Sequence, residues 1–133
     1  MGSMKYLCLI CAERAYMMEF QPPAEARQQF AQYRAFTDDV RQSGHFVGAN
    51  RLQLPETAVT LRVRNGKVST TDGPFAETKE YVGGYYLIEA ADLNDAIRIA
   101  ARIPGARYGC VEVRPVAQDA DTLRALGDAA AQA

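Results

Sequence analysis

The chain has 133 residues, a net charge of −1 at pH 7 and 48% apolar residues, which indicates one domain large enough to bury its own core. The lack of a basic block argues against nucleic acid or an anionic membrane as the main partner. No apolar run approaches the ~20 residues needed to span a bilayer, and no segment resembles a secretory signal, so we expect a cytoplasmic protein without a membrane partner.

The first elements predicted along the chain are a strand and a long helix. Residues 1–3 precede a second methionine and are predicted to be a cloning remnant. Residues 5–11 are apolar on both faces, which is typical of a strand covered on both sides. The helix is predicted over residues 23–43, because Pro23 suits a first turn, Gly44 follows its end, and apolar residues recur at spacings of three and four, at Phe30, Tyr33, Phe36 and Val40.

A β-hairpin is predicted after a second extended segment over residues 46–54. Residues 57–64 alternate apolar and polar side chains, and Asn65-Gly66 is the strongest short-range hairpin signal. A two-residue loop sets the register, so that Val59 lies opposite Asp72 and the Asp72 side chain points to the apolar side of the hairpin. We therefore expect Asp72 to be half-buried and to need hydrogen bonds or a charge partner.

A strand, a helix and a strand complete the predicted domain. Residues 83–89 are again apolar on both faces. Asp92 is the predicted N-cap of a helix over residues 93–102, with an inward face formed by Leu93, Ala96, Ile97, Ala100 and Ala101. The last strand is predicted over residues 109–116.

The predicted order of elements is β-α-β, a hairpin and β-α-β, which is a ferredoxin-like α+β sandwich with an inserted hairpin. The domain is expected over residues 4–117, followed by an amphipathic tail over residues 118–133 that is either a helix or a frayed extension. Both helices must cover one face of the sheet, yet two strands are apolar on both faces. A second copy of the chain would cover the other face, so we expect a homodimer.

The three cysteines, Cys8, Cys11 and Cys110, are predicted to be small buried apolar residues. Cys8 and Cys11 match the C-x-x-C spacing, but a redox dithiol of that kind begins a helix, whereas these residues lie in an apolar run typical of a strand. Their opposite parity would place the two side chains on opposite faces of the strand. We therefore expect no redox or metal-binding role for them.

The most informative segment is Asp72-Gly73-Pro74-Phe75-Ala76-Glu77-Thr78-Lys79-Glu80, followed by Gly83-Gly84. An Asp side chain can hydrogen-bond the nearby backbone, Gly allows a positive φ, and Pro restricts the residue before it, so the run forms a rigid corner. Carboxylates and a lysine beside such a corner can present a small-molecule site. The glycine pair is predicted to permit a bulge or a close backbone contact.

This segment resembles the DGPF-domain proteins of the wider YCII-related family, as do Met4-Lys5-Tyr6, Gly83-Gly84-Tyr85-Tyr86-Leu87-Ile88 and Glu112-Val113-Arg114-Pro115-Val116. The resemblance covers about residues 4–116. It implies a dimeric ferredoxin-like fold, found mostly in bacteria, with a suspected enzymatic role. Relatives are often encoded beside extracytoplasmic-function sigma factors, which implies a regulatory partnership as an alternative.

One feature departs from the family pattern. YCII-like relatives have a proposed His–Asp pair, with the histidine early in the first helix and the aspartate just before a proline after the second helix. The first helix here contains no histidine, and Ile103 precedes Pro104. The pair is therefore absent, and any catalysis must use other groups, centred on Asp72.

The corner supplies the predicted catalytic residues, Asp72 and Glu77. Asp72 would be the general acid or base, because desolvation of a half-buried carboxylate brings its titration into a useful range; alternatively, it is satisfied by backbone N–H groups in an Asx turn. Glu77 would orient a polar substrate and Lys79 would neutralise an anionic group, unless both lie in a solvated linker. Phe75 is a further ligand-binding candidate in the same corner.

Glu112, Arg114 and His45 are the remaining ligand-binding candidates. Glu112 and Arg114 share one strand face, where the guanidinium would grip a substrate carboxylate or form a structural salt bridge across the dimer interface. His45 is the only histidine, the residue type that titrates near neutral pH by default, and is either an acid/base or an exposed loop residue. One histidine without cysteine or histidine partners does not predict a metal site, and no phosphate-binding glycine loop is present, so no metal or cofactor is expected.

These residues leave several functions open. One is a small-molecule enzyme or ligand-binding protein with a cleft between the sheet and the hairpin, in which a carboxylate is the acid/base. The alternative is a non-catalytic regulatory or interaction module that works with a sigma factor. A third interpretation is a dimer whose central motif serves only assembly.

Overall fold

The structure is a computed structural model that describes residues 3–126. Its strands are β1 (Met4–Glu13), β2 (Phe46–Arg51), β3 (Val59–Arg64), β4 (Lys67–Asp72), β5 (Glu80–Ala90) and β6 (Cys110–Pro115). Its helices are α1 (Pro23–Gln42), α2 (Leu93–Ala100) and α3 (Ala120–Leu126), with short 3-10 turns η1 (Arg14–Tyr16), η2 (Met18–Phe20), η3 (Pro55–Thr57) and η4 (Pro104–Arg107). The predicted order of strands and helices is confirmed, and the part of the predicted tail after Leu126 lies outside the described residues.

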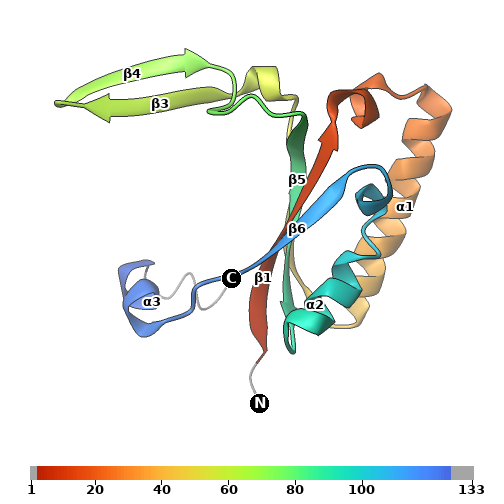
Figure 1. Cartoon of the computed structure of the whole chain (residues 1–133). Helices are drawn as coiled ribbons and strands as arrows, with labels where there is room; N and C mark the ends of the chain where they lie inside the picture. Colours follow the sequence, from red (N-terminus) through yellow and green to blue (C-terminus); the bar gives the residue numbers. More distant parts are fainter. Residues whose placement is uncertain (1–2, 127–133) are drawn as a thin grey trace.

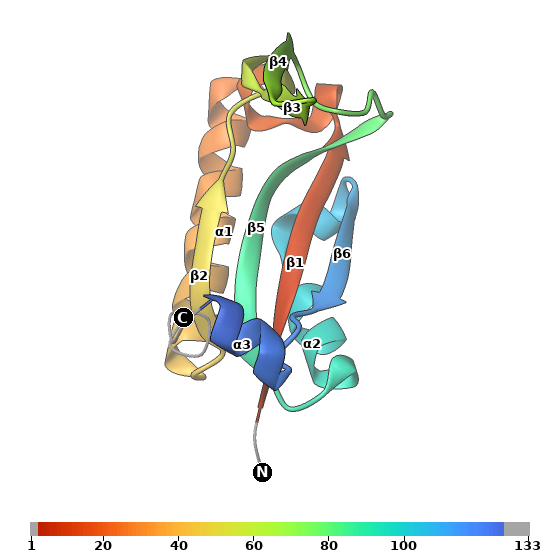
Figure 2. The same ribbon diagram turned by 90° about the vertical axis from the view of Figure 1, so that its left-hand side faces the viewer.

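Four strands form one antiparallel sheet in the order β2-β5-β1-β6, and α1 and α2 cover one of its faces (Figure 1). Figure 2 shows the opposite face, which we call the open face, with α3 lying in front of its lower end. This mixed α+β arrangement is consistent with the predicted ferredoxin-like sandwich. Within the described part of the chain, no helix combines the length and the apolar composition needed to cross a bilayer.

The core lies between the sheet and the two covering helices. Its buried side chains are Tyr6, Cys8, Phe36, Val40, Tyr86, Ile88, Ala90, Ala96, Ile99, Ala100 and Ile103. The Phe36 and Tyr86 rings meet edge to face with their centroids 5.1 Å apart, a favourable geometry for aromatic pairs. The buried Tyr86 hydroxyl hydrogen-bonds the Thr37 hydroxyl at 2.7 Å, so its polar atom is satisfied.

The predicted N-cap of α2 is confirmed, but its predicted inward face is partly wrong. Asp92 accepts a hydrogen bond of 2.8 Å from the Asp95 N–H, which satisfies one of the free donors of the first turn. Leu93 and Ile97 are 47% and 49% exposed, Ala101 is exposed as well, and Ile99 is buried in their place. The apolar residues of α2 form two possible stripes at helical spacing, one with Leu93 and Ile97 and one with Ile99. The stripe with Ile99, which continues into η4, faces the sheet and is buried.

The open face carries the other set of alternating side chains. On this face Leu7 of β1 lies opposite Leu87 of β5 and Arg114 of β6, and Leu7 and Leu87 are half-buried. The tail contacts the sheet at its lower end, where the Lys5 N–H donates to the Gln118 side chain at 3.0 Å. The two strands that were predicted to be apolar on both faces are β1 and β5. Helices cover one of these faces, and the described residues of the single chain cover the other face only in part.

The β3–β4 hairpin forms a separate two-stranded sheet that projects from the sandwich on the side of the open face (Figure 1). Its predicted register is confirmed, with Val59 opposite Asp72, and Asn65 and Gly66 have φ values of 52° and 76°, as a type I′ turn requires. The predicted half-buried position of Asp72 is wrong for the single chain: Asp72 is exposed, because no element between residues 3 and 126 packs on the apolar side of the hairpin.

Candidate functional site

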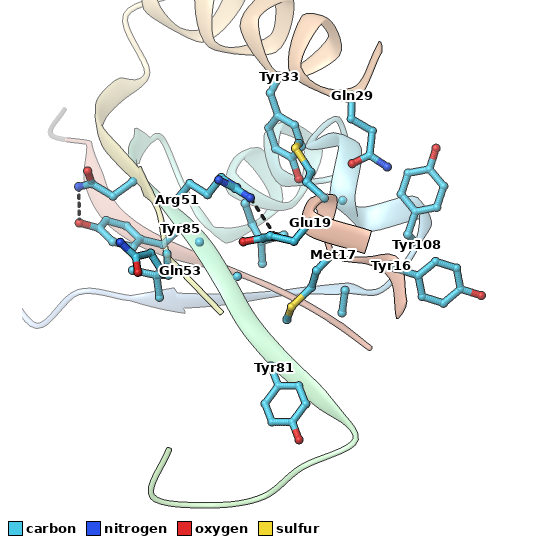
Figure 3. A pocket seen from close by; sticks show the side chains of 18 of the residues that line it. Tyr16, Met17, Glu19, Gln29, Tyr33, Arg51, Gln53, Tyr81, Tyr85 and Tyr108 are labelled. Atoms are coloured by element: carbon cyan, nitrogen blue, oxygen red, sulfur yellow. Dashed lines mark hydrogen bonds and ion pairs between the residues drawn. The ribbon is translucent and has the colours of Figure 1, made fainter. Parts of the chain in front are cut away.

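A cavity of about 280 Å³ lies near the point where β5 begins, between the first half of α1, the η1–η2 segment and the end of β2 (Figure 3). We call it the tyrosine cavity, because six tyrosines line it: Tyr16, Tyr33, Tyr81, Tyr85, Tyr86 and Tyr108. Met17, Met18 and Phe30 add apolar surface. A concave space with apolar and aromatic walls and some polar groups is typical of a small-molecule site.

The tyrosine rings are held by packing and by hydrogen bonds. The Tyr16 and Tyr108 rings are stacked, with centroids 6.3 Å apart and planes inclined by 25°. Burial raises the pKa of Tyr33 to about 12, although a hydrogen bond with the backbone of Gly105 acts in the opposite direction. Tyr33 therefore keeps its proton at neutral pH and can donate a hydrogen bond, but cannot serve as a base there.

One ion pair provides the strong charges of the tyrosine cavity. The Nη2 atom of Arg51 lies 2.9 Å from the Oε1 atom of Glu19, as the dashed line in Figure 3 shows. The guanidinium carbon also lies 5.6 Å from the centroid of the Phe30 ring, within reach of a cation–π attraction. Because a guanidinium has five N–H donors and this pair uses one nitrogen, Arg51 retains donors for a ligand oxygen.

Two glycines permit close contacts around the tyrosine cavity. A Cβ on Gly84 would lie 2.9 Å from the Asn50 carbonyl oxygen, and one on Gly105 would lie 2.6 Å from the Tyr33 hydroxyl. The register between β1 and β5 also shifts at this point, where Ile10 pairs with Gly84 and Gly83 is left without a partner on β1. The predicted bulge and close backbone contact at Gly83-Gly84 are therefore both confirmed.

The structure places the predicted catalytic corner away from the tyrosine cavity. Asp72, Glu77 and Phe75 are exposed, and Phe75 reaches 82% exposure. The Gly73 N–H donates to the Ala58 carbonyl at 2.6 Å, so the corner continues the hairpin ladder. Gly73 has a φ of +97°, as the sequence predicted for a glycine at this corner. No described residue donates a hydrogen bond to the Asp72 carboxylate, so the Asx turn is not formed.

The other charged candidates lie on or beside the open face. The Lys79 Nζ atom is 3.4 Å from the Glu13 Oε1 atom, and Lys79 is 86% exposed. Arg114 forms an ion pair with Glu112, its neighbour on the same strand face. This ion pair lies within one strand, so it is not the predicted salt bridge across an interface, which stays a prediction, and neither residue lines the tyrosine cavity.

His45 lies between the end of α1 and the start of α2. Its Nδ1 atom is 2.7 Å from the Ser43 hydroxyl, and its Nε2 atom is 3.6 Å from the Asp95 Oδ2 atom. His45 lies in the loop after α1, as one of the two alternatives predicted, but its ring is half-buried between the two helices and not exposed. Across the described residues, no three histidine, cysteine or acidic side chains gather as metal ligands.

Sequence reasoning missed the polar groups of the tyrosine cavity. Tyr33 was assigned to the buried stripe of the first helix, and Arg51 and Glu19 were not selected. Each lies in a separate segment, and only Tyr33 belongs to a recognisable pattern. The one available signal was the concentration of tyrosines and methionines in segments that end or begin strands, which by itself indicates only packing.

Comparisons with known proteins agree with the fold. Residues 4–119 match the family model of the YCII-related domain. A protein of Rhizobium meliloti (strain 1021), described only as uncharacterized, is 45% identical over 69 residues. That match covers 50% of this chain and 56% of the relative, so the chain spans about half of the relative's length. At the position before Pro104, where YCII-like relatives are proposed to carry an aspartate, Ile103 is 1% exposed and belongs to the core.

Proposed function

The chain belongs to the YCII-related family, and we propose that it binds a small organic molecule in the tyrosine cavity. The observation that carries this proposal is a partly open cavity of about 280 Å³ that six tyrosines line together with other apolar and polar residues. That volume is near the lower limit of small-molecule pockets, which suits a ligand of one ring or a short chain. The site forms within a single chain and does not depend on the hairpin.

The chemistry of the walls specifies the ligand further. Tyrosine faces attract the edges of another aromatic ring, and the stacked pair of Tyr16 and Tyr108 offers such a surface. Arg51, positioned by Glu19 and Phe30, can bind a carboxylate with its remaining donors. Tyr33 can donate a hydrogen bond from its protonated hydroxyl. We therefore propose a small aromatic carboxylate as the class of ligand.

A panel of benzoate, 4-hydroxybenzoate and phenylacetate tests this proposal by heteronuclear NMR titration of the full chain. We expect saturable chemical-shift changes at backbone amides of Gln29, Arg51 and Tyr81, which belong to three walls of the tyrosine cavity. Benzylamine, which keeps the aromatic ring and has a cationic group in place of the carboxylate, is the control and should not bind. Shift changes confined to the open face or the hairpin would contradict the proposal.

A second candidate function is catalysis at a site around Asp72 that a homodimer completes. The observation in its favour is the exposed apolar side of the hairpin, where Val59, Leu61, Val63 and Val68 are 51–64% exposed. A second copy that covers this side would desolvate Asp72, as the acid/base role requires. In this proposal Glu77 orients the substrate and Lys79 binds its anionic group.

Light scattering of the purified chain tests the assembly on which this second candidate depends. A monomer at micromolar concentration would exclude it and leave binding in the tyrosine cavity intact. Partnership with a sigma factor is a separate proposal that rests on the family resemblance alone. Its test is co-purification with an extracytoplasmic-function sigma factor, and recovery of the chain alone under mild conditions would argue against it.

A further inference from the structure

Cys11 and Cys110 lie directly opposite each other on neighbouring strands of the sheet. The antiparallel register of β1 and β6 pairs them, and all three cysteines of the chain are free thiols. Cys8, the other member of the C-x-x-C spacing, is fully buried in the core on the helix-covered face. The spacing in the sequence therefore identifies the wrong partner for Cys11, and the fold supplies the right one.

The backbone geometry at this pair suits a disulfide. Directly opposed residues in an antiparallel pair have Cα atoms ~4.5–5.5 Å apart, and disulfides bridge Cα separations of ~4.4–6.8 Å. The two strands come unusually close beside the pair: a Cβ on Gly109 would lie 1.9 Å from the Cys11 carbonyl oxygen. Directly opposed residues share a face of the sheet, and both cysteines line the same depression, so the two side chains lie on one side of the sheet.

The pair is accessible from solvent. Cys11 and Cys110 belong to a shallow depression on the open face, together with Glu13, Thr78, Lys79 and Glu80. Cys110 is exposed and its Sγ atom lies 3.7 Å from the Glu80 Oε1 atom, whereas Cys11 is half-buried behind it. The prediction that all three cysteines are buried is therefore confirmed for Cys8, only partly correct for Cys11 and wrong for Cys110. A small oxidant can reach the sulfur of Cys110 first, and Cys11 is positioned to react next.

We propose that Cys11 and Cys110 form a redox site at which a small hydroperoxide converts two thiols into an intramolecular disulfide. The Cys110 sulfur attacks the terminal peroxide oxygen, the O–O bond breaks, and the alkoxide leaves with a proton as an alcohol. The Cys11 sulfur then attacks the sulfenic sulfur of Cys110, and water leaves. In sum, two thiols and one hydroperoxide give one disulfide, one alcohol and one water, with hydrogen peroxide giving a second water in place of the alcohol.

The surroundings of the two thiols should make disulfide formation slow and the resulting disulfide long-lived. Burial raises the pKa of Cys11 to about 11, with smaller contributions from Cys110 and the nearby carboxylates. Desolvation and the Glu80 carboxylate raise the pKa of Cys110 as well. Thiols that stay protonated attack slowly, and thiols of high pKa are also poor leaving groups. The disulfide should therefore form under an excess of oxidant and then resist exchange with small thiols.

The decisive experiment treats the folded full chain with hydrogen peroxide and analyses it without reduction. We expect the number of titratable thiols to fall from three to one per chain, and the intact mass to decrease by two hydrogen atoms. A peptide map should contain a cross-link between the Cys11 and Cys110 peptides. A gain of oxygen without a cross-link, an unchanged thiol count, or a cross-link between two copies of the chain would overturn the proposal.

Three variants separate this pair from the remaining cysteine. Cys110→Ser and Cys11→Ser should each fail to form the disulfide under conditions that oxidise the native chain. Each variant should either keep both of its thiols or gain oxygen at the remaining member of the pair. Cys8→Ala should still form the disulfide and fall from two thiols to none. Loss of disulfide formation in a folded Cys8→Ala chain would show that Cys8 takes part, and would refute the assignment.

Discussion

Arg51 at the end of β2 and Glu19 in η2 form an ion pair, with 2.9 Å between Nη2 and Oε1, that joins two walls of the tyrosine cavity. The two side chains are 49% and 33% exposed, so the pair contributes less than about 1 kcal/mol to folding. Its main effect is to hold the guanidinium beside the Phe30 ring, where it faces the cavity. The contact therefore matters more for the position of the guanidinium than for the stability of the fold.

The first prediction concerns ligand affinity. Arg51→Ala should weaken binding of an aromatic carboxylate at least tenfold, because a charge-assisted hydrogen bond contributes ~1.5–3 kcal/mol. Isothermal titration calorimetry of the native and variant chains measures this change, and the Tm should hardly move. Arg114→Ala is the matched control, since Arg114 is also an exposed arginine in an ion pair and lies away from the cavity. Equal affinities for native and Arg51→Ala chains would remove Arg51 from the site.

The second prediction concerns the close contact between β2 and β5. Gly84→Ala should lower the free energy of unfolding by about 1–3 kcal/mol, the usual effect of overpacking, because its Cβ would lie 2.9 Å from the Asn50 backbone oxygen. Gly83→Ala is the control, since a Cβ there meets no atom within 4 Å. Urea denaturation of both variants gives the comparison. A Gly84→Ala chain as stable as the Gly83→Ala chain would show that β2 moves freely at this point.

The third prediction concerns pH and the start of α2. The Asp95 carboxylate accepts the Ala91 N–H at 3.0 Å and pairs with Arg98, and these contacts, with a smaller contribution from His45, hold the pKa of Asp95 below its usual 3.8. A carboxyl group with a lowered pKa in the folded state stabilises the fold above its unfolded-state pKa. That contribution is lost as the pH falls through the folded-state pKa.

We therefore expect the native chain to be more stable than Asp95→Asn at pH 7, by a difference that shrinks below about pH 4. Chemical denaturation of both chains between pH 7 and pH 2.5 provides the test. Asp38→Asn serves as the control, because Asp38 is an exposed carboxylate on α1 with no ion pair among the described residues. A stability difference that grows on acidification would have the wrong sign and would exclude this explanation.

The fourth prediction concerns the hairpin and the proposed homodimer. Leu61→Asp places a charge in the centre of the apolar side of the hairpin, where Leu61 is 58% exposed, and should shift a dimer to monomers without unfolding the sandwich. Arg62→Ala changes the opposite side of the same strand and should leave assembly unchanged. Sedimentation velocity distinguishes the two results. A Leu61→Asp chain that remains dimeric would place the interface elsewhere.

Local patterns were sufficient for much of the fold. The register of the hairpin, with Val59 opposite Asp72, follows from Asn65-Gly66 alone, because a two-residue turn aligns the strands that it joins. The N-cap at Asp92 also depends on a few adjacent residues and was predicted correctly, whereas the Gly83-Gly84 pair predicted a close contact but not its partner, Asn50 on β2. The exposure of Asp72 was not predicted correctly, because the burial of a side chain depends on which surface another element covers.

The sequence by itself determined the order of elements, the hairpin register and the family, because each of these depends on short stretches of adjacent residues. Only the tertiary structure decided that the cavity lies beside Tyr33 and Arg51 and that Cys110 faces Cys11. These positions depend on the order β2-β5-β1-β6, which brings distant segments together. The alternation of side chains along a strand indicates which residues share a face. The packing of the whole sheet determines which strand lies next to them.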